Sequence, residues 1–174
     1  MKTFPIFYVF VLLSFCGLSK SYSQCELLNE VQADGSMMYY FEPATFYYTK
    51  SKSLKINLLT DDENFYIVLQ PTPFPEKSIG KKINDDLKIQ LSNKEWYVLK
   101  HYDTQYLKSN TIFQVVYLIN KRDLDAFTNY EAETASISMK GTRFVHNYAF
   151  KLHKRAIMEQ IACYHEKHDK KKPN

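Results

Sequence analysis

Residues 54–69 read LKINLLTDDENFYIVL, and this stretch decides the fold class. Apolar and polar side chains alternate from Leu54 to Leu58, which is the period of two typical of a half-buried strand. The polar residues Thr60 to Asn64 then separate this run from a second apolar run, Phe65 to Leu69. Two apolar runs joined by about five polar residues predict a β-hairpin.

The segments C-terminal to this hairpin repeat the same pattern. Leu87 to Leu91 alternates, and the chain returns in Trp96 to Lys100, which predicts a second hairpin. Thr134 to Met139 and Arg143 to Tyr148 flank a Lys140-Gly141 turn and predict a third. We expect these segments to form antiparallel ladders.

Two further apolar segments favour strands, each with a distinct feature. Ile112 to Ile119 is almost unbroken apolar, which is typical of a central strand covered on both faces. Met37 to Thr49 is rich in aromatic residues but contains Pro43, which indicates a bulge or an edge position. Prolines at 71, 73 and 75 predict that Gln70 to Lys82 is an extended loop.

Two helices are predicted. Asn120 is a good N-cap residue for a short helical turn over Lys121 to Phe127. A longer helix is expected from Ala149 to His168, because apolar residues recur there at spacings of three, four and seven. This stripe consists of Phe150, Ile157, Ile161 and Tyr164.

Together these elements predict a mainly β fold. We expect an antiparallel β-sandwich or a strongly curled sheet of about seven strands, with the C-terminal helix packed on it. The sequence shows no internal repeat and few glycines or prolines, so one β-rich domain over residues 24–168 is the simplest organisation. Residues 169–174 form a basic tail that we expect to be frayed and solvated.

The N-terminus has the pattern of a signal peptide over residues 1–23. Lys2 precedes an apolar run from Phe4 to Leu18, which is shorter than the about 20 residues of a spanning helix. Ser21 and Ser23 place small side chains at the −3 and −1 positions of a cleavage after Ser23. The alternative is an uncleaved anchor helix. Cleavage predicts a secreted or periplasmic protein without a membrane span in the mature chain.

The two cysteines of the mature chain predict a disulfide. Cys16 leaves with the signal peptide, so Cys25 and Cys163 remain as an even pair in an oxidising compartment. On the expected helix Cys163 lies about 120° from Ile157, off the apolar stripe, where it can face the N-terminal segment. The alternative is two unrelated thiols.

The charge argues against nucleic acid as a partner. The net charge of +4 falls by two when Lys2 and Lys20 are removed, and much of the remainder lies in Lys170 to Lys172. Three lysines in a tail attract anionic surfaces only weakly at physiological salt. We therefore expect no nucleic-acid binding.

No catalytic, cofactor or metal motif is present in the sequence. Phosphate loops, dinucleotide fingerprints, paired CxxC motifs and nucleophile elbows are all lacking. His165 and His168 share a helix face but supply only two ligands, where zinc needs three or four. We expect no cofactor and no metal. The alternative is a small hydrolase that combines His101 or His146 with carboxylates such as Asp85 or Asp86.

The aromatic content is the remaining functional clue. Fourteen tyrosines and twelve phenylalanines exceed what so small a chain usually carries, and exposed tyrosines make good contact surfaces. We therefore predict a non-catalytic binding module for a protein or glycan of the envelope or extracellular space. The alternative is that these side chains fill the core. The predicted contact residues are Tyr39, Tyr40, Tyr47, Tyr48 and Phe74.

Overall fold

The structure is a computed structural model that describes residues 25–74, 83, 85–138 and 145–169. Its strands are β1 (Leu28–Val31), β2 (Met37–Tyr40), β3 (Ala44–Tyr48), β4 (Ser53–Thr60), β5 (Phe65–Thr72), β6 (Leu87–Leu91), β7 (Trp96–Leu107), β8 (Ile112–Ile119), β9 (Ala132–Ser138) and β10 (Val145–Ala149). Its helices are α2 (Leu124–Asn129) and α3 (Ala156–Asp169). The mainly β prediction with a C-terminal helix is confirmed. The described part has ten strands, so the expected number of about seven was too low.

The extra strands come from the N-terminal segment. β1 is only four residues long and has no clear alternation, and the aromatic segment around Pro43 forms two strands rather than one. β2 and β3 both pair with β4, β2 at Leu59–Thr60 and β3 at Ser53–Ile56. Pro43 lies between them, where no ladder hydrogen bond is needed.

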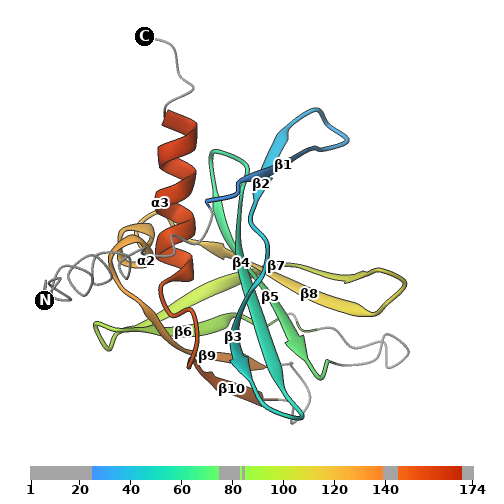
Figure 1. Ribbon diagram of the computed structural model, residues 1–174, viewed down its shortest axis with the longest axis vertical. Coiled ribbons are helices and arrows are strands. Elements are labelled where there is room, and N and C mark those ends of the chain that lie inside the picture. Colours follow the sequence, from blue (N-terminus) through green and yellow to red (C-terminus); the bar gives the residue numbers. More distant parts are fainter. Residues whose placement is uncertain (1–24, 75–82, 84, 139–144, 170–174) are drawn as a thin grey trace, which may run out of the picture.

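All strand pairs are antiparallel, in the order β1-β2-β4-β5-β8-β7-β6-β9-β10 with β3 beside β4 (Figure 1). The sheet curls until β3 meets the chain that follows β10. The N–H groups of Lys151 and Leu152 both donate to the carbonyl of Phe46, at 3.1 and 3.2 Å. The rings of Phe46 and Phe150 pack edge to face at 4.6 Å. The architecture is therefore the strongly curled sheet.

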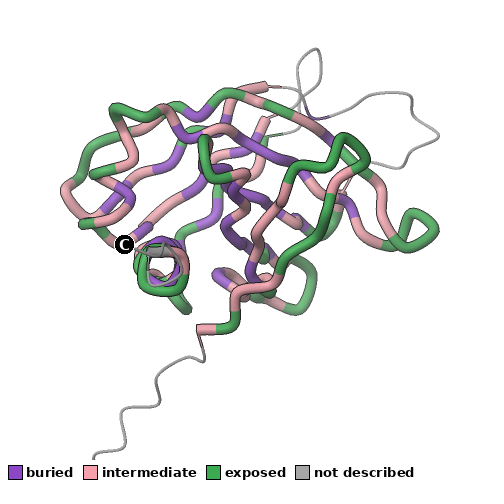
Figure 2. The backbone as a smooth tube through the Cα atoms, turned by 90° about the horizontal axis from the view of Figure 1, so that it is seen from above, coloured by how far each residue is buried: buried purple, intermediate pink, exposed green. Residues whose placement is uncertain are grey.

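The main core lies on the inner face of this curl (Figure 2). Ile56, Ile67, Ile89 and Val115 come from four different strands and are fully buried. Helix α3 adds its buried apolar residues to the same cluster. The core therefore joins the helix to the sheet, as the apolar stripe predicted.

Helix α3 begins at Ala156, seven residues later than predicted. The β9–β10 ladder continues through the pair Thr134–Ala149, and the N–H of Phe150 then donates to the carbonyl of Glu133. The backbone is therefore extended where the helix was expected to start. Phe150 still contributes to the core, but it does so from the end of the strand.

Helix α3 also completes the hydrogen bonding of β4. At Leu58 the edge of β4 is covered by neither β2 nor β3, so its N–H would lack a strand partner. The side chain of Gln160 in α3 accepts this hydrogen bond at 2.7 Å. A buried N–H needs such a partner, and Gln160 thereby fixes the helix against the sheet.

The predicted disulfide is present. Cys25 and Cys163 are bonded, with Cα atoms 5.6 Å apart. The bond ties the chain just before β1 to α3. In the described part of the chain, no helix is long and apolar enough to cross a bilayer. The predicted signal peptide, residues 1–23, lies outside the described residues.

The predicted hairpins are confirmed as β4–β5, β6–β7 and β9–β10, although the Lys140-Gly141 turn lies outside the described residues. Two boundaries besides the start of α3 were wrong. The short helix α2 begins at Leu124, after a turn in which the N–H of Asp123 donates to the carbonyl of Asn120. Strand β5 continues to Thr72, so the first part of the predicted proline loop is a strand.

Candidate binding site

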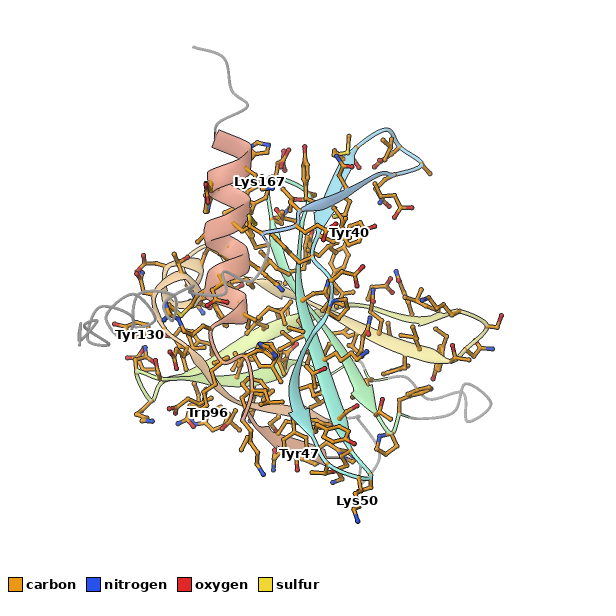
Figure 3. All side chains as sticks on the ribbon, viewed as in Figure 1. Tyr40, Tyr47, Lys50, Trp96, Tyr130 and Lys167 are labelled. Carbon is orange, nitrogen blue, oxygen red and sulfur yellow. A yellow bond between two sulfur atoms is a disulfide. The ribbon has the colours of Figure 1, made fainter. Side chains whose placement is uncertain are left out.

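The five aromatic residues predicted to form a contact surface are dispersed. Tyr39 is half-buried, with its ring 5.9 Å from that of Tyr164 on α3. Tyr47 is half-buried against Tyr148, with ring centroids 5.5 Å apart. Tyr40 and Tyr47 lie at well-separated places on the molecule (Figure 3). Among the tyrosines of this set, Tyr48 is the most exposed, at 69 %.

Phe74, the fifth predicted residue, packs on the protein. Its ring stacks on Phe113, with centroids 5.5 Å apart and planes 11° apart, and it contacts Tyr106 edge to face. The side chain is half-buried and also lines a cleft of about 210 Å³ at the ends of β5 and β8. Phe74 is therefore both a packing residue and part of a concave surface.

The outer face of β7 carries exposed apolar residues that sequence reasoning did not select. Trp96 is 52 % exposed and Val98 is 42 % exposed, while the alternate residues Tyr97 and Leu99 face the core. Tyr102, farther along the strand, is 63 % exposed. These three outward residues, Trp96, Val98 and Tyr102, are referred to below as the β7 strip, and Figure 3 labels Trp96.

A β-bulge gives Tyr102 its position. His101 pairs with Tyr117 and Asp103 pairs with Val116, so Tyr102 is the extra residue between two ladder pairs. Bulges re-aim side chains and are common at functional positions. Here the ring of Tyr102 is turned over Tyr66, with centroids 4.9 Å apart.

Polar residues border the β7 strip. Gln90 of β6 pairs with Trp96, and Lys88 pairs with Val98. On the next strand, Thr134 and Ser136 pair with Gln90 and Lys88. An aromatic side chain bordered by amide, hydroxyl and ammonium groups is a typical composition for an interaction surface. The sequence held a usable signal, because Lys100 marks the solvent side of β7 and shares its parity with Trp96.

The histidine and carboxylate groups of the hydrolase alternative form separate pairs. The ring of His101 is hydrogen-bonded to the Thr104 hydroxyl at 2.7 Å, and Asp86 accepts from the backbone N–H of His101. Asp85 accepts from Ser138 at 3.0 Å. A catalytic triad needs one continuous series of hydrogen bonds, from the nucleophile to the histidine and from the histidine to the carboxylate. His101 is thus held by a threonine, and the serine by a carboxylate.

Two buried tyrosines and His146 have perturbed ionisation on the inner side of the curl. Burial raises the pKa of Tyr148 to about 12, and burial together with the charges of Asp85 and Asp86 raises the pKa of Tyr117 well above its ordinary value. Burial, with a smaller contribution from Lys52, lowers the pKa of His146. The two tyrosines therefore stay protonated at neutral pH and are unsuited to act as bases.

The two histidines of α3 lie in different surroundings. His165 is exposed, whereas His168 stacks on Tyr164 and lies 3.3 Å from Asp62. The hydroxyl of Tyr164 donates to the same carboxylate. These contacts fasten the end of the helix to the β4–β5 turn. Among the described residues, no group of three or more histidine, cysteine or acidic side chains is placed to hold a metal ion.

Comparisons with known proteins add no family. No protein-family model matches the chain, and neither the curated proteins nor the solved structures contain a match. The functional argument therefore depends on the chemistry of the chain and on the geometry of its surfaces.

Proposed function

We propose that the protein is exported through a signal peptide cleaved near Ser23 and acts as a non-catalytic binding module of the envelope or extracellular space. Its partner is a protein or a glycan held by exposed aromatic side chains. The Cys25–Cys163 disulfide supports an oxidising compartment, because such bonds persist outside the reducing cytosol. The absence of a catalytic motif from the sequence supports a binding role.

The β7 strip is the observation that carries this proposal. Exposed aromatic and aliphatic side chains that polar residues border favour contact with a partner, and here Lys100 lies on the same face between Val98 and Tyr102. Tryptophan and tyrosine contribute strongly to such contacts because they combine large apolar area with one polar group. Trp96 and Tyr102 provide both, on one face of one strand.

A variant of Trp96 tests the proposal. The mature protein, purified from the medium or envelope of its host, is immobilised and exposed to an envelope extract and to a glycan array. We expect a specific partner from the extract or from the array. Trp96→Ala should reduce its affinity at least about tenfold, because a tryptophan at the centre of an interface often contributes about 2 kcal/mol or more.

The matched control is Tyr130→Ala, which removes an aromatic side chain of 42 % exposure from the segment between α2 and β9 rather than from β7. It should leave the affinity within about twofold. Equal losses in both variants, or a partner whose affinity Trp96→Ala does not change, would contradict the role of the β7 strip. Turnover of a substrate by the wild-type protein would contradict the non-catalytic assignment.

A further inference from the structure

A cleft lies where β5 and β8 separate. Their ladder ends at the pair Leu69–Val115, and a side-chain hydrogen bond between Gln70 and Gln114 follows it at 3.2 Å. The next residue, Pro71, has no N–H with which to continue pairing. β5 stays joined to β4 as far as Thr72, while the start of β8 diverges. The space between the two strands is the cleft of about 210 Å³.

One wall of the cleft is apolar. Phe74 and Phe113 stack with nearly parallel rings, and Ile112 and Pro71 extend the surface. The half-buried Phe74 is held in place by this stack. A rigid apolar wall suits the flat face of a ring, because little side-chain entropy is lost when a ligand packs against it.

The other groups that line the cleft are polar. Three hydroxyls come from Ser53, Thr72 and Thr111, and Gln70 contributes an amide. Lys55 is the cation of this lining set, and none of the described lining residues is acidic. Lys55 is exposed and forms no ion pair with any described residue. A ligand with hydroxyl groups and one negative charge would complement this surface.

The size of the cleft restricts the ligand further. Pockets for drug-sized molecules measure about 300–1,000 Å³, so this cleft admits one ring rather than several. A phosphate group would favour a site with more than one cation or with a cradle of backbone N–H groups. The apolar wall and the hydroxyl groups instead favour a sugar ring.

We propose that this cleft binds one uronic acid unit of an acidic polysaccharide. The carboxylate of the sugar pairs with Lys55, its hydroxyl groups bond to Gln70 and to the threonines, and one ring face packs on Phe74. The site is separate from the β7 strip and does not depend on it. It gives the protein a second contact, directed to an acidic glycan.

Titration with tetragalacturonate, followed by NMR of the mature isotope-labelled protein, tests this proposal. We expect chemical-shift changes at Gln70, Thr72 and Thr111, and we expect Lys55→Gln to weaken binding about tenfold. The matched control is Lys121→Gln, the same charge change at an exposed position after the C-terminal end of β8, whereas the cleft lies at the start of β8. It should alter affinity less than about twofold. A neutral galactose tetramer should bind at least about tenfold more weakly than the acidic one.

The inference would be overturned by absence of binding, by equal losses for Lys55→Gln and Lys121→Gln, by equal affinity for the neutral tetramer, or by stronger binding of a peptide carboxylate at the same residues. Trp96→Ala separates the two proposals. If it abolishes tetragalacturonate binding, the sugar binds at the β7 strip, so the cleft proposal fails while the proposed function stands.

Discussion

The outer face of the curled sheet differs between two regions, the β5–β8 region, called the sealed half below, and the region around β6 and β7, called the open half. On β5 and β8 the outward side chains form a second, sealed cluster in which Val68 is 1 % exposed and Val116 is 3 % exposed. On β7 the corresponding outward positions hold Trp96 and Val98, which are about half exposed. The same chain therefore buries apolar side chains on one outer face and displays them on the other.

The neighbouring residues explain this difference. Val68 and Val116 lie among larger apolar side chains, Tyr66, Leu59 and Leu118, which cover them. Trp96 and Val98 instead have Gln90 and Lys88 as cross-strand neighbours, and these leave the apolar area open. Since the fold can seal an outer face and does so on β5 and β8, exposure on β7 is not a requirement of the architecture. The exposure of Trp96 and Val98 is therefore the feature that supports a binding function.

The largest expected effect tests what holds the sealed half together. Cys163 lies on α3, which also bonds to β4 through Gln160, so the disulfide fastens the N-terminus to this half. Replacing both cysteines by alanine opens a loop with a sequence separation of 138 residues. Chain-entropy models give about 4–5 kcal/mol for loops of this length, and we expect a loss approaching that value.

Denaturant unfolding measures this loss, and the fluorescence of Trp96, the sole tryptophan of the sequence, serves as the probe. The native emission should stay unchanged, because Trp96 lies on the other half. A loss below about 1 kcal/mol would show that the disulfide adds little beyond the packing of α3. A changed native emission would show that the two halves are not independent.

The second prediction places one substitution on both outer faces. Val116→Asp buries an unpaired carboxylate in the sealed cluster and should cost about 3–5 kcal/mol. Val98→Asp places the same group at a half-exposed position and should change the free energy of unfolding by less than about 0.5 kcal/mol. The measurement is the denaturation midpoint of each variant. Similar costs for the two would remove the distinction between the sealed and the open face.

Local patterns predicted most of the sheet. The alternation at 54–58 and the unbroken run at 112–119 determined which faces are buried, and both became central strands. β1 was not predictable because it is short, largely exposed and without alternation, although its partner β2 is the next strand in the sequence. The division of the 37–49 segment depends on β2 and β3 pairing with two different parts of β4, which local patterns do not report. The start of α3 was misplaced because the backbone of Phe150 pairs with Glu133, a contact that helical periodicity does not report.

The candidate sites were harder to predict than the fold. The pairing of Cys25 with Cys163 followed from compartment and helix geometry, and it is confirmed. Exposure of aromatic residues depends on what covers them, so tyrosines such as Tyr39 and Tyr47 could not be assigned to a surface from sequence. The cleft at Phe74 depends on where Pro71 ends a ladder, which requires the strand order.

The smallest expected effect concerns ionisation on the inner side of the open half. Burial and the nearby Lys52 lower the pKa of His146 below its ordinary value in the folded protein. The unfolded chain titrates at about 6.5, so it takes up a proton first as the pH falls. His146 therefore favours the folded state fully above about pH 6.5, and this contribution is lost as the pH falls through the lower folded value.

Denaturant midpoints measured between pH 7.5 and 5 should therefore decline for the wild type and decline less for His146→Gln. The matched control is Asn147→Gln at an exposed position beside His146 on β10, which changes no ionisable group and should keep the wild-type slope. Asp86 and Glu133 should not contribute here, because hydrogen bonds from Lys100 and Lys94 lower their pKa values, so they titrate at more acidic pH. An identical slope for wild type and His146→Gln would mean that His146 is as well solvated in the folded protein as in the unfolded chain. Water would then reach His146 on the inner side of the sheet, so this part of the interior would be no better sealed than the outer face of β7.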